Sequence, residues 1–298
     1  MSEILSLLLF VAPLVAYRIN SVLNSFEKPI DDNEDIENQL NKRKILACTR
    51  IHKTQGMSSS YVAIEKVLSF LENLPANTDS VLICIGGVDD DNKGKDFLNN
   101  INKLKLRCSK KFSQGIHIIQ IEPWGKFTHA LNVAVRFAVD NNFDVLQFMS
   151  LETKVSYQTL KTLLSYLHSN VTVVGASLPG HRFNQGYNKI KGTTCPWNTL
   201  AIWDVNILGL TGFPLIGDGL PNVPGGVEEV TTINLLQKIN PNYKAILISV
   251  PEVSWNIEFD DPKRKEWHET KMKSKNQRPQ KHMELLGIDD GIVIHIKE

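Results

Sequence analysis

The sequence predicts an α/β domain with a mainly parallel central sheet that helices flank on both faces. From residue 44 onward, short apolar runs alternate with amphipathic stretches whose apolar residues recur at helical spacing. Strands that alternate with helices of this length indicate a mainly parallel sheet covered on both sides. Hydrophobic residues make up 42% of the 298 and charged residues 22%, which is ordinary for a globular protein with a sizeable core.

Five apolar runs are candidate strands, and three of the stretches between them are candidate helices. Thr128 and Ser156 stand where they can cap two of these helices. Sheets of this type bind ligands at the carboxyl ends of their strands, so functional residues are expected directly after the apolar runs. The candidate strands are residues 45–48, 81–85, 116–121, 145–149 and 171–176, and the candidate helices are residues 58–74, 128–140 and 156–167.

The two ends of the chain differ from this pattern. Residues 4–17 carry no charge, but the run is shorter than the ~20 residues of a membrane span, so it is either an anchor or a packed helix. Arg18 and Lys28 follow it, which predicts a cytoplasmic protein with peripheral membrane contact through this segment. The expected parts are residues 1–26 (hydrophobic segment), 27–43 (polar linker), 44–258 (catalytic domain) and 259–298 (basic C-terminal extension).

Charge and cysteine content exclude some classes of function. Lys and Arg number 33 against 32 Asp and Glu, so no global basic field favours a nucleic acid partner. The four cysteines form no C-x-x-C pair and are expected to be free thiols, not a zinc site or a disulfide framework.

Polar residues follow the second and third apolar runs. Asp89, Asp90 and Asp91 form either a solvated turn or a carboxylate contact with a nucleotide base or ribose. In the segment EPWGKFTHALN, Gly125 allows a close turn and Lys126 offers a cation. Asn132 near the start of an apolar helix either satisfies backbone groups or faces a pocket.

Acidic residues follow at two further positions. Carboxylates after a central strand hold Mg²⁺ or Mn²⁺ against a diphosphate, because hard cations prefer oxygen ligands. Here Glu152 is the one carboxylate, with Ser150 two residues before it, and a helix-start charge is the alternative. Glu228 and Glu229 open a later helix, where they complement the helix dipole or supply a general base.

These segments, in this order, resemble the family 2 glycosyltransferases, which have the glycosyltransferase A fold of nucleotide-diphospho-sugar transferases. The resemblance covers roughly residues 44 to 255. Its motifs are Thr49-Arg50 after the first run, VDDDN for the acidic loop, Gly125-Lys126 with Ala130-Leu131-Asn132, Ser150 and Glu152 at the Asp-x-Asp position, LTGFP at residues 210–214, and Glu228-Glu229 for the Glu-Asp pair.

The resemblance implies a hexosyltransferase-type enzyme that moves a sugar from a UDP- or GDP-linked donor to an acceptor hydroxyl with inversion. Glu229 would be the base with Glu228 beside it, and Glu152 would bind Mn²⁺ or Mg²⁺. The sugar and the acceptor are not specified. The implied nucleotide-sugar site comprises Thr49, Arg50, Asp89, Asp90, Asp91, Gly125, Lys126, Asn132 and Ser150.

The sequence departs from the family where the leaving diphosphate needs a metal or fixed cations. Ser150 replaces the first Asp, so the motif is Ser-Leu-Glu, and the Gln-x-x-Arg-Trp motif of processive synthases is missing. The basic tail offers cations that could take the place of the metal, with His268 also a candidate metal ligand. The alternative is that this stretch is a solvated helix. The cations are Arg264, Lys265, His268 and Lys271. A catalytically inactive binding or scaffold protein with the same fold is therefore the alternative function.

Overall fold

A computed structural model describes residues 43–52, 64–74, 78–86, 115–122, 124–126, 128–255 and 262–298, together with residues 99, 102, 103 and 106. The expected hydrophobic segment at residues 1–26, nearly all of the linker and the three aspartates at 89–91 lie outside the described residues. Among the described helices, none combines the length and the apolar character that crossing a membrane requires.

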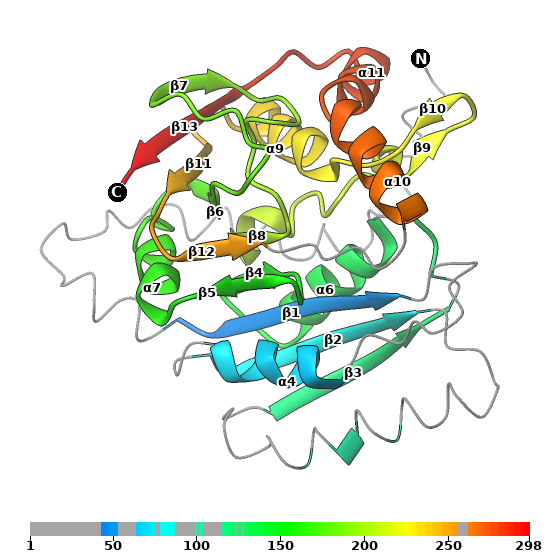
Figure 1. Ribbon diagram of the computed structural model, residues 1–298. Helices are drawn as coiled ribbons and strands as arrows, with labels where there is room; N and C mark the ends of the chain where they lie inside the picture. The colour runs from blue at the N-terminus through cyan, green and yellow to red at the C-terminus, as the bar shows by residue number, and fades with distance from the viewer. Residues whose placement is uncertain are drawn as a thin grey trace, which may run out of the picture.

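The described residues form a mostly parallel central sheet of nine strands in the order β3-β2-β1-β4-β8-β6-β11-β13-β7 (Figure 1). Only β8 and β7 run antiparallel to their neighbours. The predicted fold class is therefore confirmed, and each of the five candidate runs lies in a strand. The strands are β1 (Ile45–His52), β2 (Ser80–Gly86), β3 (Gly115–Ile121), β4 (Val145–Met149), β6 (Val171–Ala176), β7 (Gly186–Lys189), β8 (Leu200–Asp204), β11 (Lys244–Ser249) and β13 (Ile292–Lys297).

Helices cover both faces of this sheet because its strands are apolar on both sides. Leu46 and Cys48 of β1 face a core that α6 and α9 close, whereas Ile45 and Ala47 face a second core that α4 and α7 close. In Figure 1, α4 lies in front of the sheet and α6 behind it. The helices are α4 (Ile64–Asn73), α6 (Thr128–Asp140), α7 (Tyr157–Ser165), α8 (Val205–Leu208), α9 (Glu228–Ile239), α10 (Pro262–Lys273) and α11 (Gln277–Leu286), with a 3₁₀ turn η1 (Leu215–Asp218).

The two predicted helix caps have different outcomes. Ser156 caps α7, because its side chain accepts a hydrogen bond from the backbone N–H of Thr159. Thr128 does not cap α6 but is its first residue, and its own N–H donates to Oδ1 of Asp218 at 2.7 Å. The cap of α6 thus comes from a residue 90 positions away, which local sequence patterns cannot reveal.

The C-terminal segment is integrated into the domain. β13 pairs with β11 along five residues and also with β7, so residues expected as a basic extension complete the central sheet. α10 and α11 lie beside the small hairpin of β9 (Gly219–Leu220) and β10 (Val223–Pro224) (Figure 1). A second small sheet joins β5 (Thr153–Val155) to β12 (Val253–Trp255). The boundary at residue 258 therefore does not separate an appendage from the domain.

Candidate functional site

Ser150 and Glu229 both bond to the segment directly before β8, at the carboxyl edge of the sheet. The N–H of Ser150, directly after β4, donates to the carbonyl of Thr199 at 2.9 Å. One residue earlier, the N–H of Asn198 donates to Oε1 of Glu229 at 2.7 Å. β8 starts at Leu200 and runs antiparallel to β4, so its beginning lies beside the end of β4. Two segments that are far apart in the sequence are therefore held together where sheets of this class bind ligands.

A tight turn presents the two glutamates. Val227 precedes them in the left-handed region at φ 63°, an unusual conformation for a β-branched residue. A Cβ on Gly225 would lie 2.4 Å from the carbonyl oxygen of Asp218, so only glycine fits at that position. Glu228 and Glu229 are each 6% exposed. The chain therefore holds two carboxylates out of water through a conformationally costly turn, as functional sites often do.

Burial and charge change the proton affinity of Glu229. Burial, followed by repulsion from Glu228, raises the pKa of Glu229 to about 7, while the hydrogen bond from Asn198 opposes the increase. Burial lowers the pKa of Lys275 to about 7, and the charge of Glu229 opposes that decrease. A carboxylate with a pKa near neutrality is matched to general-base work at neutral pH.

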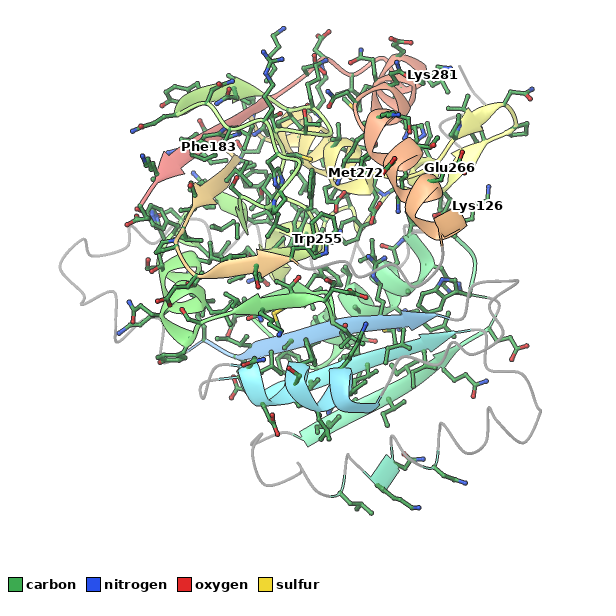
Figure 2. The ribbon with its side chains drawn as sticks, viewed as in Figure 1. Lys126, Phe183, Trp255, Glu266, Met272 and Lys281 are labelled. Atoms are coloured by element: carbon green, nitrogen blue, oxygen red, sulfur yellow. The ribbon has the colours of Figure 1, made fainter. Side chains whose placement is uncertain are left out.

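Trp197 forms the wall of this site. The ammonium of Lys275 lies 2.8 Å from the centroid of the Trp197 ring. His181 stacks on the same indole at 3.6 Å between ring centroids, and burial lowers the pKa of His181 to about 3, so this imidazole is neutral. Trp255 of β12 meets Trp197 edge-on at 6.0 Å, and Met272 of α10 packs against the same core (Figure 2). The lysine thus lies on an aromatic surface that α10 helps to cover.

Arg278 joins the C-terminal helices to the turn that carries the glutamates. Its guanidinium donates to the carbonyl of Gly225 at 2.8 Å and to the carbonyl of Lys271 at 3.0 Å. His282 of α11 contacts the carbonyl of Pro224 at 3.1 Å. α10 and α11 therefore form part of the site.

The structure places the other candidate residues differently. Thr49 is 1% exposed on the α4 side of β1, and among the described residues its hydroxyl has no hydrogen-bond partner. Arg50 points to the opposite side, where its charge reaches Lys271. Both amide atoms of Asn132 bond to one residue, since its Oδ1 accepts from the N–H of Phe213 and its Nδ2 donates to the same residue's carbonyl.

Other strand-end candidates are partly or fully exposed. Gly125 adopts φ 72°, which accounts for a glycine in that turn, and the adjacent Lys126 is exposed (Figure 2). The hydroxyl of Ser150 pairs with that of Thr153 at 3.0 Å. Roles for these residues in nucleotide-sugar binding stay predictions.

The described residues do not fit a metal site. Glu152 is partly exposed in the turn between β4 and β5, and among the residues that the structure describes no three His, Cys, Asp or Glu side chains cluster as metal ligands do. The side chain of His268 on α10 lies outside the description. Free thiols, by contrast, are observed as expected at Cys48, Cys84 and Cys195.

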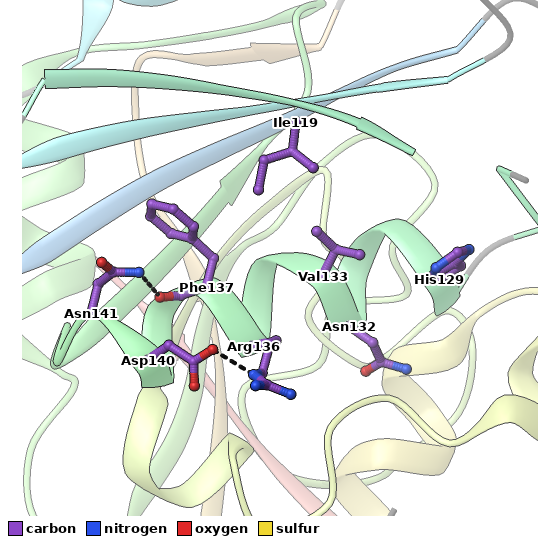
Figure 3. A pocket seen from close by; sticks show the side chains of 8 residues that line it. All are labelled: Ile119, His129, Asn132, Val133, Arg136, Phe137, Asp140 and Asn141. Carbon is purple, nitrogen blue, oxygen red and sulfur yellow. Dashed lines mark hydrogen bonds and ion pairs between the residues drawn. The ribbon is translucent and has the colours of Figure 1, made fainter. Parts of the chain in front are cut away.

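A hollow of about 430 Å³ along α6 is not this site (Figure 3). Its lining combines apolar side chains such as Ile119 and Phe137 with polar and charged ones, Asn132 among them. Its charged pair, Arg136 and Asp140, is joined at 2.5 Å, and Nδ2 of Asn141 donates to the carbonyl of Phe137. These polar groups already have partners, so the hollow offers no group poised for chemistry.

The sequence interpretation missed Trp197, Asn198, Lys275 and Arg278. Trp197 and Asn198 stand in an irregular loop, and Lys275 and Arg278 stand in a run of basic residues that looks like a solvated helix. No local signal distinguishes them from their neighbours, because their roles come from contacts with segments 30 to 80 residues away.

Comparisons with known proteins give distant likenesses in fold. No protein-family model and no curated protein sequence matches the chain. Among solved structures, residues 1–349 of TarS from S. aureus align at 15% identity and a TM-score of 0.45, over 71% of this chain and 60% of that one. The 4-diphosphocytidyl-2C-methyl-D-erythritol synthase of Anaerococcus prevotii aligns at 12% identity and a TM-score of 0.45, over 77% and 96% of the two chains.

A third similar structure is GalNAc-T7 with UDP, GalNAc and Mn²⁺, at 11% identity and a TM-score of 0.34. It aligns over 46% of this chain and 23% of its own length, so this chain spans less than two thirds of both TarS and GalNAc-T7. The likeness concerns a mostly parallel central sheet flanked by helices.

Proposed function

We propose that the protein is a non-processive, inverting glycosyltransferase that moves a sugar from a nucleotide-diphosphate donor to an acceptor hydroxyl. The observation that carries the proposal is Glu229, a buried carboxylate at the carboxyl edge of the sheet whose pKa is raised to about 7. A group of this kind accepts a proton near neutral pH, which the transfer to a hydroxyl requires.

In the proposed reaction, the acceptor oxygen attacks the anomeric carbon of the sugar from the side opposite the diphosphate. The new carbon–oxygen bond forms as the bond to the diphosphate breaks, and its electron pair leaves with the nucleoside diphosphate. The hydroxyl proton passes to Glu229. The hydrogen bond from the N–H of Asn198 to Oε1 fixes the orientation of this carboxylate.

No step of this proposal passes through a metal, because the described residues do not form a site for one. Glu152 stays a candidate metal ligand through its place after β4. If Glu152 binds a metal, Glu152→Ala removes the dependence of nucleotide binding on Mn²⁺ or Mg²⁺, measured by thermal shift with and without chelator. An unchanged metal response removes Glu152 from the site.

The test of the function measures release of UDP or GDP from a panel of nucleotide sugars, with water as the default acceptor. Glu229→Gln keeps the shape and the acceptor atom for Asn198 but cannot take the proton, so turnover falls by about 10²–10⁴-fold. Nucleotide binding stays nearly intact, and a ligand at a hundred times its Kd still adds ~2.7 kcal/mol of stability. The matched control is Glu284→Gln, an exposed glutamate on α11, which leaves turnover unchanged.

Two results contradict this proposal. Full turnover in Glu229→Gln removes Glu229 from the chemistry. Nucleotide binding without turnover of any donor favours the catalytically inactive binding protein instead.

A further inference from the structure

Four cations and two carboxylates come together where β1, α9, α10 and α11 meet. Burial lowers the pKa of Lys271, and the positive charges of Arg278 and Arg50 add to the decrease. The positive charges of Lys271 and Arg278 likewise lower the pKa of Lys275. The cations are therefore close enough to repel one another. They are Arg50, Lys271, Lys275 and Arg278, and the carboxylates are Glu228 and Glu229.

Among the residues that the structure describes, Lys275 has no oxygen partner. Its ammonium has three donors, yet in the described part of the chain its contacts are the Trp197 ring at 2.8 Å and the sulfur of Met272 at 4.0 Å. No ion pair within 4.0 Å joins it to Glu229 among the described residues, although the two charges influence each other. The residue as a whole is partly exposed, whereas its ammonium is largely withdrawn from water.

The backbone of Lys275 is fixed in place. A Cβ on Gly192 would lie 1.9 Å from the carbonyl oxygen of Lys275, so the turn after α10 packs directly on this glycine. The N–H of Thr193 donates to Oδ1 of Asn276 at 2.9 Å. Arg278, committed to two carbonyls, holds the following helix. The backbone that carries the ammonium is therefore held in place, which limits the positions that the ammonium can take.

Among the described residues, the cluster has four cations and two carboxylates, so its net charge is suited to an anion. Arg50 stands near the carboxyl end of β1, whose neighbours in the sheet are β2 and β4. Ligands of such sheets bind outside the strand ends at the switch in strand order. Lysine ammonium groups are common partners of phosphate oxygens.

We propose that Lys275 and Lys271, with Arg50 at the end of β1, bind the diphosphate of the nucleotide-sugar donor and stabilise it as it leaves. This inference rests on the proposed function. The ammonium groups of Lys271 on α10 and Lys275 in the turn after it, together with the guanidinium of Arg50 on β1, then supply positive charge at the leaving diphosphate.

The test is isothermal titration of the full chain with UDP, GDP and inorganic pyrophosphate, each in chelator and in Mn²⁺. Wild-type protein binds in chelator, and Lys275→Met weakens binding by about tenfold or more, whereas Lys275→Arg retains most of the affinity because it keeps the charge. Lys273→Met, which changes an exposed lysine at the end of α10, is the matched control and changes affinity less than about twofold. Thermal melts of each variant verify folding.

The possible results separate the two proposals. Nucleotide binding that requires Mn²⁺ and is unchanged in Lys275→Met overturns the cation site but leaves the proposed function standing. Pyrophosphate binding that Lys275→Met weakens, without binding of either nucleotide, supports the anion site and overturns the nucleotide-sugar donor. Failure of all three ligands to bind wild-type protein overturns both.

Discussion

The two edges of the central sheet use polar residues in opposite ways. At the amino edge, where β6, β11 and β13 begin, a hollow of about 540 Å³ is lined by Asn234, Gln237 and Asp290 among others. Gln237 accepts from the N–H of Ile292 at 2.9 Å and donates to its carbonyl at 2.8 Å. Asn234 accepts from the N–H of Gly291, and Asp290 pairs with Lys191. These polar groups are matched within the protein.

At the carboxyl edge, two buried ionisable side chains have shifted pKa values. The pKa values of Glu229 and Lys275 both move to about 7, from opposite directions and chiefly through burial. The amino edge has a hollow whose polar groups are matched, whereas the carboxyl edge has buried groups with shifted pKa values. Shifted pKa values of buried groups are a reason to regard the carboxyl edge as the candidate site.

The largest expected effect is the loss of stability when Trp197, the wall of the candidate site, is removed. Trp197→Ala removes a buried ring that stacks on His181, supports Lys275 and donates from Nε1 to the carbonyl of Gly192 at 2.7 Å. We expect the free energy of unfolding to fall by about 3–5 kcal/mol, measured by urea denaturation. Trp197→Phe, which keeps an aromatic ring, loses about 1 kcal/mol through the lost hydrogen bond. Equal losses in both variants would show that the ring itself contributes little.

The next prediction concerns pH. The folded pKa of Glu229, about 7, exceeds its ordinary value of 4.5. Its contribution to stability is therefore complete below the unfolded pKa and is lost as pH rises through about 7. The Glu229→Gln variant does not have this loss. The difference in free energy of unfolding, variant minus wild type, therefore rises by on the order of 2 kcal/mol between about pH 5 and pH 8.5. A difference that does not vary with pH would contradict a buried, titrating carboxylate.

A matched polar group at the amino edge should behave differently. Asn234 is 1% exposed, and its Nδ2 donates to the carbonyl of Val230 at 2.8 Å. Asn234→Ala leaves the N–H of Gly291 without its acceptor, which lowers the free energy of unfolding by about 1–2 kcal/mol at every pH. Denaturation at the same two pH values measures it. A pH-dependent loss would remove the contrast between the edges.

The smallest expected effect is the change in stability on replacing Asn132, and the accompanying nucleotide affinity tests the role of this residue. Because both amide atoms bond to the backbone of Phe213, Asn132→Ala costs about 1 kcal/mol of stability. A purely structural role predicts unchanged nucleotide affinity at a temperature where the variant is folded. A large loss of affinity would instead support its predicted place in the nucleotide-sugar site.

The sequence predicted the features that depend on local pattern. Apolar runs indicated strands because residues buried on both faces leave a continuous hydrophobic signal, and the glutamates after Val227 stood out at a helix start. It could not reveal that Asp218 caps α6 or that Lys275 lies on Trp197. Such contacts join segments whose distance in space is set by the whole fold. The chain order of strand-end motifs predicted Ser150 and Glu229 at one edge, but the basic segment beside the candidate site resembled a solvated surface.

The most direct test of the account is the titration of Glu229 itself. Carboxyl-¹³C-labelled glutamate in the intact protein, compared with Glu229→Gln to assign the resonance, reports the protonation of this side chain by NMR. The account predicts a midpoint at about 7. A midpoint near the ordinary glutamate value of 4.5 would contradict it, because such a carboxylate is neither held out of water nor matched to general-base work at neutral pH.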